Sequence, residues 1–568
     1  DAAVLTSVTY STNPANNSTD ESVLAAAISA EASAAGQTFT LTASGTSGSL
    51  DNITGTDGAD TIYALANTSL ETGDVISGGA GVDSITSRHT LTADLTVSPT
   101  ISGVENHFVR IDADGDVGDD ILSYDMDGVT GAEKVTAYRL NNSGTTSDGV
   151  LTVSGAGFTT AVVGGITGGD SDAANSSMDV NFNYAGVTGS SDSATLALDG
   201  AAAQTVTIDA IETLNITTAN NDKTVSSTGA STLLSLVADD ASTVNISGDG
   251  DVTLSATNFA ATVTVNAEGL TGDSTYVVET STLTFTGGSG ADTVNMNGTY
   301  TSADTVNGGD GVDIIILTNA EADATSEQTK LSNVEKIQLS DALDGNAVSL
   351  ANYSATGLIL TAVDNDGTVN FAAGTGTLEF GTVDQEESTF TVNGDVASTS
   401  DVLNITTGTS TTAGAGYGQV NVNHFETVNL TMLTGAMTTA ASIDGIAMAP
   451  SAGSTFNVLG SVGDTLGTIT ASTIDASGMS LAATTTTGVT LTAGGSSFVT
   501  GSSGVDQLTG SAGVDRLVGG TGDDTLITGG GADVVQGGVG ADVITFSDSD
   551  ANTTITVIAT ATESSVGE

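Results

Sequence analysis

The sequence predicts an all-β protein made of parallel β-roll or β-solenoid blocks, linked by further β-solenoid or sandwich-like segments. A nine-residue repeat that ends in a short apolar stretch recurs in three places along the 568 residues. The segments between these places alternate Thr and Val with polar residues, as half-buried strands do. Only residues 21–36 read as a helix, with Asp20 as its N-cap and Gly36 as its C-terminal stop.

The clearest repeat covers residues 501–545, where five nonapeptides follow one another without a break. Their shared pattern is Gly-Gly-x-Gly-x-Asp-x-U-x, in which U is apolar. Each repeat is expected to form a tight turn followed by a short strand that buries its apolar side chain. Position eight holds Leu508, Leu517, Leu526, Val535 and Ile544. Position six holds Asp506, Asp515, Asp524, Asp533 and Asp542.

The same pattern occurs in two earlier blocks, at residues 46–86 and 283–316. Full copies and in-register partial copies each place an aspartate at position six. In the first block these aspartates are Asp51, Asp60, Asp74 and Asp83. In the second block they are Asp292, Asp304 and Asp313.

The spacing predicts how the repeats stack. Two nonapeptides make one coil of about 18 residues, so turns two repeats apart lie on the same side. We therefore predict one ladder of Asp506, Asp524 and Asp542, and an opposite ladder of Asp515 and Asp533. Stacked carboxylates repel one another unless a cation lies between them, and hard oxygen ligands suit Ca²⁺.

Turn glycines are predicted to share in this site, because glycine adopts the positive φ angles of tight turns and leaves carbonyl groups free to coordinate. These glycines are Gly79, Gly81, Gly309, Gly311, Gly520, Gly522, Gly538 and Gly540. The unbroken pattern is identified as the RTX calcium-binding repeat, so several Ca²⁺ ions are the expected cofactor. The alternative is a metal-free array of Gly-Asp turns.

A second signature, an apolar residue followed by Glu, appears after the first two blocks at Glu105 and Glu335. Similar strands contain Glu133, Glu212 and Glu426, and together they indicate a larger duplication of the chain. Each Glu either completes a calcium shell from the neighbouring coil or caps a turn. A separate acidic cluster is either a second type of calcium site or a solvated turn. It consists of Asp112, Asp114, Asp116, Asp119 and Asp120.

These signatures divide the chain into seven segments. Three contain the nonapeptide blocks, and two of these also contain a Glu strand. The expected order is an N-terminal segment with a short helix (1–45), block 1 with its Glu strand (46–110), a β segment (111–282), block 2 with its Glu strand (283–340), a second β segment (341–491), the block 3 β-roll (492–547) and a C-terminal tail (548–568).

The composition excludes several functions. Eight Lys and Arg face 68 Asp and Glu, so the chain cannot grip a nucleic-acid backbone or dock on an anionic membrane. No apolar run is long enough to span a membrane. The absence of Cys excludes disulfides and thiol catalysis. No nucleophile elbow, zinc-protease motif or P-loop occurs, so no catalytic residues are predicted and we expect a non-enzyme.

The many Thr-x-Thr runs allow two interpretations of what these threonines do. A flat Thr array could bind ordered water or sugar, or Thr simply fills solvent-facing strand positions because of its β preference. The latter is the simpler interpretation.

The three blocks and the Cys-free, Lys-poor composition resemble the RTX-type surface-layer (S-layer) proteins of alphaproteobacteria. The resemblance is closest over residues 237–316 and 101–109. It implies a type I secreted, cell-surface protein that assembles with copies of itself into a calcium-dependent two-dimensional lattice. In that family an N-terminal helical region anchors the protein to lipopolysaccharide; beyond the short helix at residues 21–36 no such region is expected in this sequence, so binding to lipopolysaccharide is expected through a region outside it. The chain begins at Asp1 rather than Met, so we expect a processed or partial product.

Two alternatives from other classes remain open. One is a segment of a calcium-dependent RTX adhesin that binds a receptor or glycan. The other is an extracellular carbohydrate-active enzyme that carries RTX modules.

Overall fold

The computed structural model describes most of the three blocks and much of the segments between them. The described residues are 35–43, 50–67, 69–113, 120–142, 150–156, 160–164, 179–184, 187, 189–199, 204–219, 231–255, 257–279, 282–324, 330–343, 345–361, 367–381, 389–407, 419–432, 443–448, 453–461, 465–481, 487–546 and 554–555. The predicted helix lies outside these residues except for its last two positions, and residues 114–119 of the acidic cluster also lie outside them.

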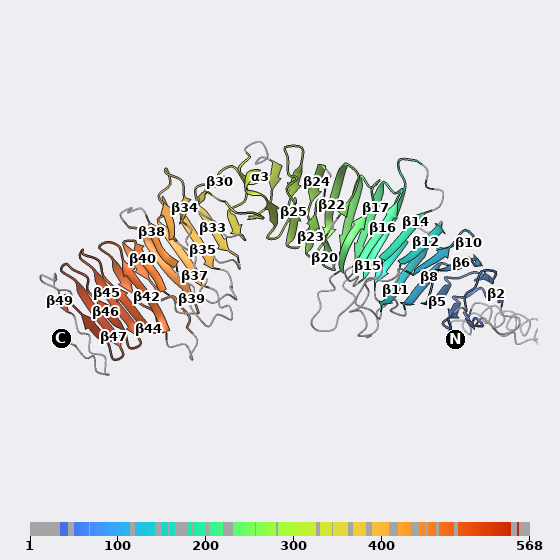
Figure 1. Cartoon of the computed structure of the whole chain (residues 1–568), viewed down its shortest axis with the longest axis horizontal. Helices are drawn as coiled ribbons and strands as arrows, with labels where there is room; N and C mark the ends of the chain where they lie inside the picture. Colours follow the sequence, from blue (N-terminus) through green and yellow to red (C-terminus); the bar gives the residue numbers. More distant parts are fainter. Residues whose placement is uncertain are drawn as a thin grey trace, which may run out of the picture. The chain divides into compact units, whose positions relative to one another are not determined.

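The chain divides into two compact units. Unit 1 holds residues 1–292 and 309–311, and unit 2 holds residues 293–308 and 312–568. In both units the chain passes from one sheet to another at nearly every strand, and the strand pairs of the described residues run parallel, as Figure 1 shows within each unit. This is solenoid topology, so the sandwich alternative for the linking segments is not what the structure adopts.

Unit 1 contains three parallel sheets. The first holds β1 (Thr38–Thr40), β3 (Thr61–Ala64), β5 (Ser84–Leu91), β8 (Asn106–Ala113), β11 (Lys134–Asn142), β13 (Thr160–Gly164), β15 (Ser193–Asp199), β17 (Thr213–Thr218), β19 (Thr243–Gly248), β22 (Thr262–Leu270) and β24 (Thr282–Thr286). The second holds β6 (Leu95–Val97), β9 (Ile121–Asp125), β12 (Val150–Ala156), β14 (Asp179–Tyr184), β16 (Gln204–Asp209), β18 (Ser231–Val237), β20 (Val252–Leu254), β21 (Thr257–Asn258) and β23 (Ser274–Val277). The third holds β2 (Asn52–Thr54), β4 (Val75–Ser77), β7 (Thr100–Ser102) and β10 (Val129–Thr130).

Unit 2 is built in the same way. One sheet holds β25 (Asp292–Asn295), β27 (Ile314–Leu317), β29 (Lys336–Leu339), β31 (Gly357–Leu360), β33 (Thr375–Phe380), β35 (Val402–Thr407), β37 (Thr427–Met432), β39 (Thr455–Gly460), β41 (Thr473–Asp475), β43 (Phe498–Thr500), β45 (Arg516–Thr521), β47 (Val534–Val539) and β49 (Thr554–Ile555). The facing sheet holds β30 (Ala347–Ser349), β32 (Gly367–Asn370), β34 (Thr389–Asn393), β36 (Gln419–Asn423), β38 (Ile443–Met448), β40 (Thr465–Thr470), β42 (Thr487–Ala493), β44 (Val505–Thr509), β46 (Thr525–Ile527) and β48 (Val543–Thr545). A short pair, β26 (Thr305–Asn307) with β28 (Leu331–Ser332), completes the unit.

The core is a stack of aliphatic layers, because every second residue of a strand points inward. In β37 the side chains of Val428 and Leu430 are buried, while Asn429 between them is half-buried. The next coil repeats this pattern at Phe456 and Val458, which pair in register with those residues. In-register stacking also aligns polar residues, and Asn429 donates an amide hydrogen bond to Asn404. The alternation predicted from sequence is therefore confirmed.

One short helix interrupts the strands of the described residues. Helix α3 (Asn319–Asp323) follows β27 and begins at a capping box formed by Thr318 and Glu321. In that part of the chain no helix has the length and hydropathy required to cross a lipid bilayer.

Candidate calcium-binding turns

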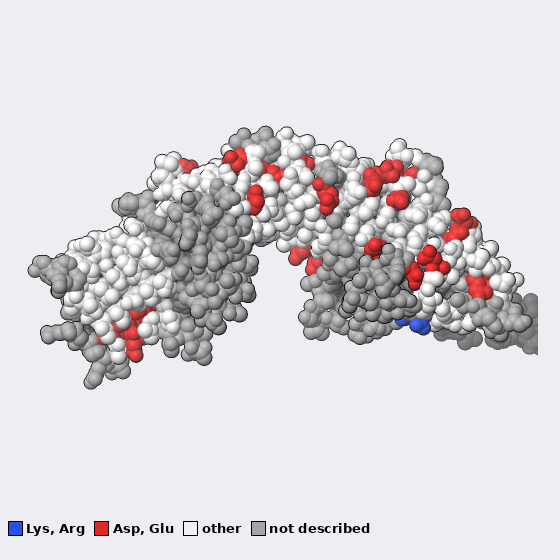
Figure 2. Space-filling view, in the orientation of Figure 1, with Lys and Arg blue, Asp and Glu red and all other residues white. Residues whose placement is uncertain are grey.

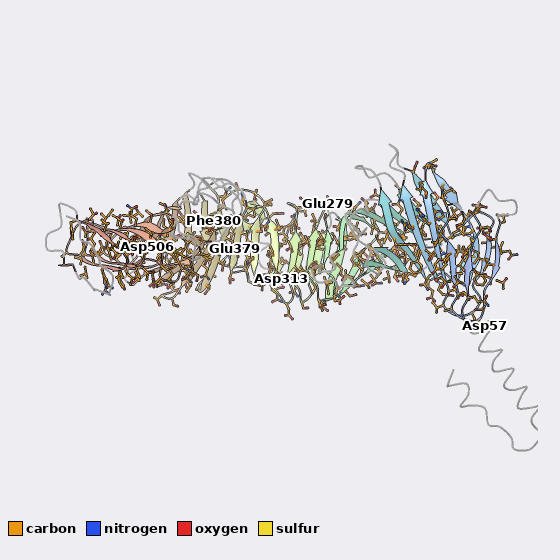
Figure 3. All side chains as sticks on the ribbon, turned by 90° about the horizontal axis from the view of Figure 1, so that it is seen from below. Asp57, Glu279, Asp313, Glu379, Phe380 and Asp506 are labelled. Carbon is orange, nitrogen blue, oxygen red and sulfur yellow. The ribbon has the colours of Figure 1, made fainter. Side chains whose placement is uncertain are left out.

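The aspartates at position six of the repeats lie in the interior although they are charged. Figure 3 labels two of them, Asp313 and Asp506. Eleven of the twelve predicted aspartates are at most 2% exposed, and Asp51 is half-buried. The eleven are Asp60, Asp74, Asp83, Asp292, Asp304, Asp313, Asp506, Asp515, Asp524, Asp533 and Asp542. Buried carboxylates require hydrogen bonds, a counter-charge or a metal.

The predicted ladders of block 3 are confirmed. The backbone N–H of Asp506 donates to Oδ1 of Asp524 (2.9 Å), and that of Asp524 donates to Oδ1 of Asp542 (3.1 Å). On the opposite side, the N–H of Asp515 donates to Oδ1 of Asp533 (2.8 Å). Each step spans 18 residues, which is the predicted coil length.

Block 1 forms the same two ladders with a longer coil. The N–H of Asp60 donates to Oδ1 of Asp83 (2.7 Å), and that of Asp51 donates to Oδ1 of Asp74 (2.9 Å). Each step here spans 23 residues rather than 18. The extra residues lie between β3 and Asp74, so the predicted 18-residue coil holds for block 3 and not for block 1.

The partial copies of the repeat, which carry Asp74 and Asp304, have a shorter turn than the full copies. In the second block the N–H of Thr301 donates to Oδ2 of Asp304 (2.7 Å) over three residues. In the first block the N–H of Glu71 makes the same bond to Asp74 (2.7 Å).

The predicted turn glycines all have left-handed backbones. Their φ values are +104° (Gly79), +112° (Gly81), +103° (Gly309), +129° (Gly311), +118° (Gly520), +127° (Gly522), +123° (Gly538) and +152° (Gly540). Only glycine adopts these angles at low cost. Stacking adds a second requirement, because a Cβ at Gly520 would lie under 3.0 Å from the carbonyl oxygen of Ser502 in the preceding coil.

In the turns whose position one is glycine, such as those of Gly78 and Gly519, this glycine faces a cradle of oxygen atoms. A Cβ built on Gly78 would lie under 3.0 Å from both Oδ2 of Asp83 and the carbonyl oxygen of Gly103 on the next coil. At Gly519 the same point faces Oδ2 of Asp524 and the carbonyl oxygen of Gly537. A turn carboxylate and a carbonyl from the next coil therefore converge on one place.

Several carboxylate oxygens in these cradles lack a hydrogen-bond donor. Oδ2 of Asp83, Asp524 and Asp542 is buried and accepts no hydrogen bond. Among the described residues no three His, Asp or Glu side chains gather as a metal cluster. The carbonyl groups that converge beside these aspartates would supply the other ligands of a bound cation. One carboxylate with several carbonyls is a donor set that Ca²⁺ accepts, and bound Ca²⁺ would supply the missing positive charge.

Burial also changes the acidity of these groups. Burial raises the pKa of Asp83, and it raises that of Asp524 to about 7, with the neighbouring aspartate charges adding to the effect. Asp60 is different. Burial opposes its ionisation, but hydrogen bonds from Thr56 and Gln37 outweigh that and lower its pKa.

We expect calcium-free protein to become more stable as the pH falls from about 8 to about 6.5. The pKa of Asp524 is about 7 in the folded chain and close to 3.9 when unfolded. The folded chain therefore holds this proton more tightly, and its contribution to stability is lost as the pH rises through 7. Thermal melting in chelator should show this trend, and D524N should flatten it. With excess calcium the trend should reverse, because protons then compete with the metal. Chelated protein that is less stable at pH 6.5 would contradict the assignment.

The Glu strands continue the aspartate ladders. Oε2 of Glu105 accepts the backbone N–H of Asp83 (2.7 Å), and Oε2 of Glu335 accepts that of Asp313 (2.8 Å). Glu426 makes the same contact with Asp401 at 2.8 Å. Each Glu thus occupies the position that the next aspartate would have. These three Glu side chains are half-buried, and through this contact each caps the turn of the preceding aspartate.

A left-handed residue stands two positions before every one of these glutamates. The residues are Gly103, Gly131, Ala210, Asn333 and His424. In three of the five this is not a glycine, which costs about 1–2 kcal/mol. The carbonyl groups of Gly103 and Asn333 complete the cradles beside Gly78 and Gly308. The left-handed φ at these two residues therefore places a carbonyl oxygen in the site. Sequence reasoning found the glutamates but missed these residues.

Sequence reasoning also missed Asp401. This side chain is fully buried, and its oxygens accept the N–H groups of Gly374 (2.7 Å) and Asp395 (3.1 Å). Its turn lacks the nonapeptide pattern. The sequence feature that could have indicated this aspartate is Glu426, which lies one coil later and accepts its N–H.

Two histidines are buried in unit 1. His107 donates from Nε2 to the carbonyl of Val104 (3.1 Å), and its Nδ1 accepts from the Tyr124 hydroxyl (3.0 Å). Burial lowers the pKa of His89 and of His107 to about 4. His107 therefore has a structural role in the core, as a buried residue of β8.

Comparison with protein families finds RTX calcium-binding nonapeptide repeats in four copies, at residues 46–67, 300–318, 492–517 and 509–544. These matches fall on the three blocks whose turns are described above. No curated protein matches the chain. The repeats support an RTX-type protein, and RTX nonapeptide repeats bind multiple calcium ions. Proteins with such repeats are typically secreted and extracellular.

Proposed function

We propose that this chain is a structural, non-enzymatic protein of a bacterial cell surface, which assembles with copies of itself into a calcium-dependent lattice. The observation that carries the proposal is that aspartate ladders occur in both units, as part of solenoids that continue through the linking segments. Calcium at these ladders would make each unit rigid.

The surface beside the ladders is suited to contacts between copies. At position five of several repeats a valine points to solvent, and Val82 and Val514 are 64% and 60% exposed. Exposed carboxylates such as Asp57, Asp310 and Asp523 lie in other turns of the same three blocks. Figure 2 shows such acidic groups as separate patches on a largely uncharged surface. Apolar contacts and calcium bridges between carboxylates would together hold neighbours.

Folding that depends on calcium would also suit export from the cell. In a compartment with little calcium, repulsion within the aspartate ladders opposes folding. Outside the cell, where calcium is abundant, binding and folding occur together.

Electron microscopy of the purified protein with and without calcium tests this function. We expect ordered two-dimensional sheets with calcium and dispersed protein after chelation. Single dispersed particles under both conditions would contradict the lattice and favour the adhesin alternative. Turnover of an acidic polysaccharide that is lost on mutation of one carboxylate pair would instead favour an enzyme.

A further inference from the structure

The nonapeptide turns are of two kinds, which differ at positions two and four. In one kind both positions are glycines with positive φ, as at Gly520 and Gly522. In the other kind neither position has a positive φ, and position two is Ser, Thr or, in the turn Gly287–Asp292, a glycine (Gly288) whose N–H donates to Oδ2 of Asp292 (2.8 Å). We call the first kind open turns and the second kind closed turns. The closed turns with a hydroxyl at position two are Gly55–Asp60, Gly501–Asp506 and Gly510–Asp515.

In a closed turn the position-two residue satisfies the aspartate. The N–H of Ser502 donates to Oδ2 of Asp506 (2.7 Å), and the Ser502 hydroxyl donates to Oδ1 (2.8 Å). The N–H of Gly504 donates to that hydroxyl oxygen at 3.0 Å, which fixes its direction. Val489 of the preceding coil donates its N–H to Oδ1 as well (2.5 Å). Both carboxylate oxygens therefore accept hydrogen bonds from the protein.

The other two closed turns with a hydroxyl at position two repeat this network. Thr56 donates its N–H to Oδ2 (2.6 Å) and its hydroxyl to Oδ1 (2.9 Å) of Asp60. Ser511 donates both its N–H (2.7 Å) and its hydroxyl (2.9 Å) to Oδ2 of Asp515. Each of these is the first turn of its ladder.

In an open turn the aspartate keeps an unsatisfied oxygen. The peptide that follows the left-handed glycine at position two points away from the aspartate. In the turn of Asp83, for example, the N–H of Ala80 donates to the carbonyl of Thr56 in the preceding coil (3.1 Å). Oδ2 of Asp83, Asp524 and Asp542 is then buried without a donor. The open turns of Asp83, Asp524 and Asp533 each stack on a closed turn, and the open turn of Asp542 stacks on that of Asp524.

We propose that only the open turns are calcium sites, and that Thr56, Ser502 and Ser511 replace the metal in the turns of Asp60, Asp506 and Asp515, with which their ladders begin. Hydrogen-bond donors that point at a carboxylate occupy the lone pairs that a cation needs. The closed turns would then be metal-independent ends on which calcium-dependent coils stack. The proposal rests on the calcium binding proposed above and states where that calcium is held. The Asp401 turn, with both oxygens satisfied, belongs with the closed kind.

The test compares two positions of one ladder, Asp506 in a closed turn and Asp524 in an open turn. Calcium bound per chain is measured by equilibrium dialysis of the full-length protein, and melting is measured in chelator. D524N should lose about one ion, and its chelated form should melt higher, because a buried unpaired charge is removed. D506N should keep the full number of ions and melt lower, because an amide cannot accept all these bonds.

A milder variant covers the case in which D506N fails to fold. S502A removes only the hydroxyl, so it should lower the melting temperature by the same amount with and without calcium, at an unchanged ion number. Loss of an ion in S502A or D506N, or an unchanged ion number in D524N, overturns the proposal. If the wild-type protein itself binds no calcium, the proposed function fails, and the distinction between turns fails with it.

Discussion

Chelation of calcium is expected to unfold most of the ordered chain at room temperature. A ligand that is present at 100 times its dissociation constant stabilises the folded state by about 2.7 kcal/mol per site. The five turns whose position-two glycine is left-handed, at Gly79, Gly309, Gly520, Gly529 and Gly538, would together match the usual 5–15 kcal/mol stability of a domain. Without the ion, buried carboxylates such as Asp524 must ionise unpaired or take up a proton.

Calorimetry and far-ultraviolet circular dichroism with and without chelator would measure this effect. Magnesium serves as the control, because its smaller, strictly octahedral shell does not suit a carbonyl-rich turn. Added calcium should restore the transition and added magnesium should not. A melting curve that chelator leaves unchanged would rule out calcium as the stabilising component.

Replacement of Gly520 by Ala is expected to destabilise block 3 strongly although it adds a single methyl group. The residue has φ +118°, and the new Cβ would lie under 3.0 Å from the backbone oxygen of Ser502. The left-handed angle costs about 1–2 kcal/mol and the overlap adds about 1–3 kcal/mol. Because backbone is on both sides of the contact, the coils must separate, which also moves the cradle beside Gly519.

Gly495→Ala is the matched control. A Cβ there meets nothing within 4 Å, and the backbone angle is not left-handed. The melting temperature of G520A should fall by roughly 5 °C or more, and that of G495A should stay the same or rise slightly, since alanine reduces the freedom of the unfolded chain. Equal effects of the two substitutions in calcium would contradict the stacked-turn geometry.

Much of the fold could be predicted because its determinants are periodic. The nine-residue spacing of Asp506 to Asp542 sets an 18-residue coil, and the apolar residue at position eight sets the buried layer, where Leu508 and Leu526 are fully buried. The linking segments have variable coil lengths and less regular turns. Their alternation predicted strands, but it could not decide between a solenoid and a sandwich, because both need one buried face.

The site was predicted less completely than the fold. The aspartates and turn glycines follow from the motif, whereas the difference between Asp506 and Asp524 depends on backbone direction at position two, which the motif treats as a tolerated substitution. Asp401 was missed because its turn has two additional residues and no Gly-x-Gly pattern. The residue before each Glu strand was missed because Asn333 and His424 do not indicate a left-handed backbone by themselves.

A crystal structure of the protein grown in calcium, with anomalous difference maps, tests the central claim most directly. The account predicts peaks in the cradles beside Gly78, Gly308, Gly519 and Gly537, each about 2.3–2.6 Å from an aspartate oxygen. The cradles beside Gly55 and Gly501, whose aspartates are satisfied by Thr56 and Ser502, should show none. Absence of peaks from the first group would contradict calcium as the ion that holds these ladders together.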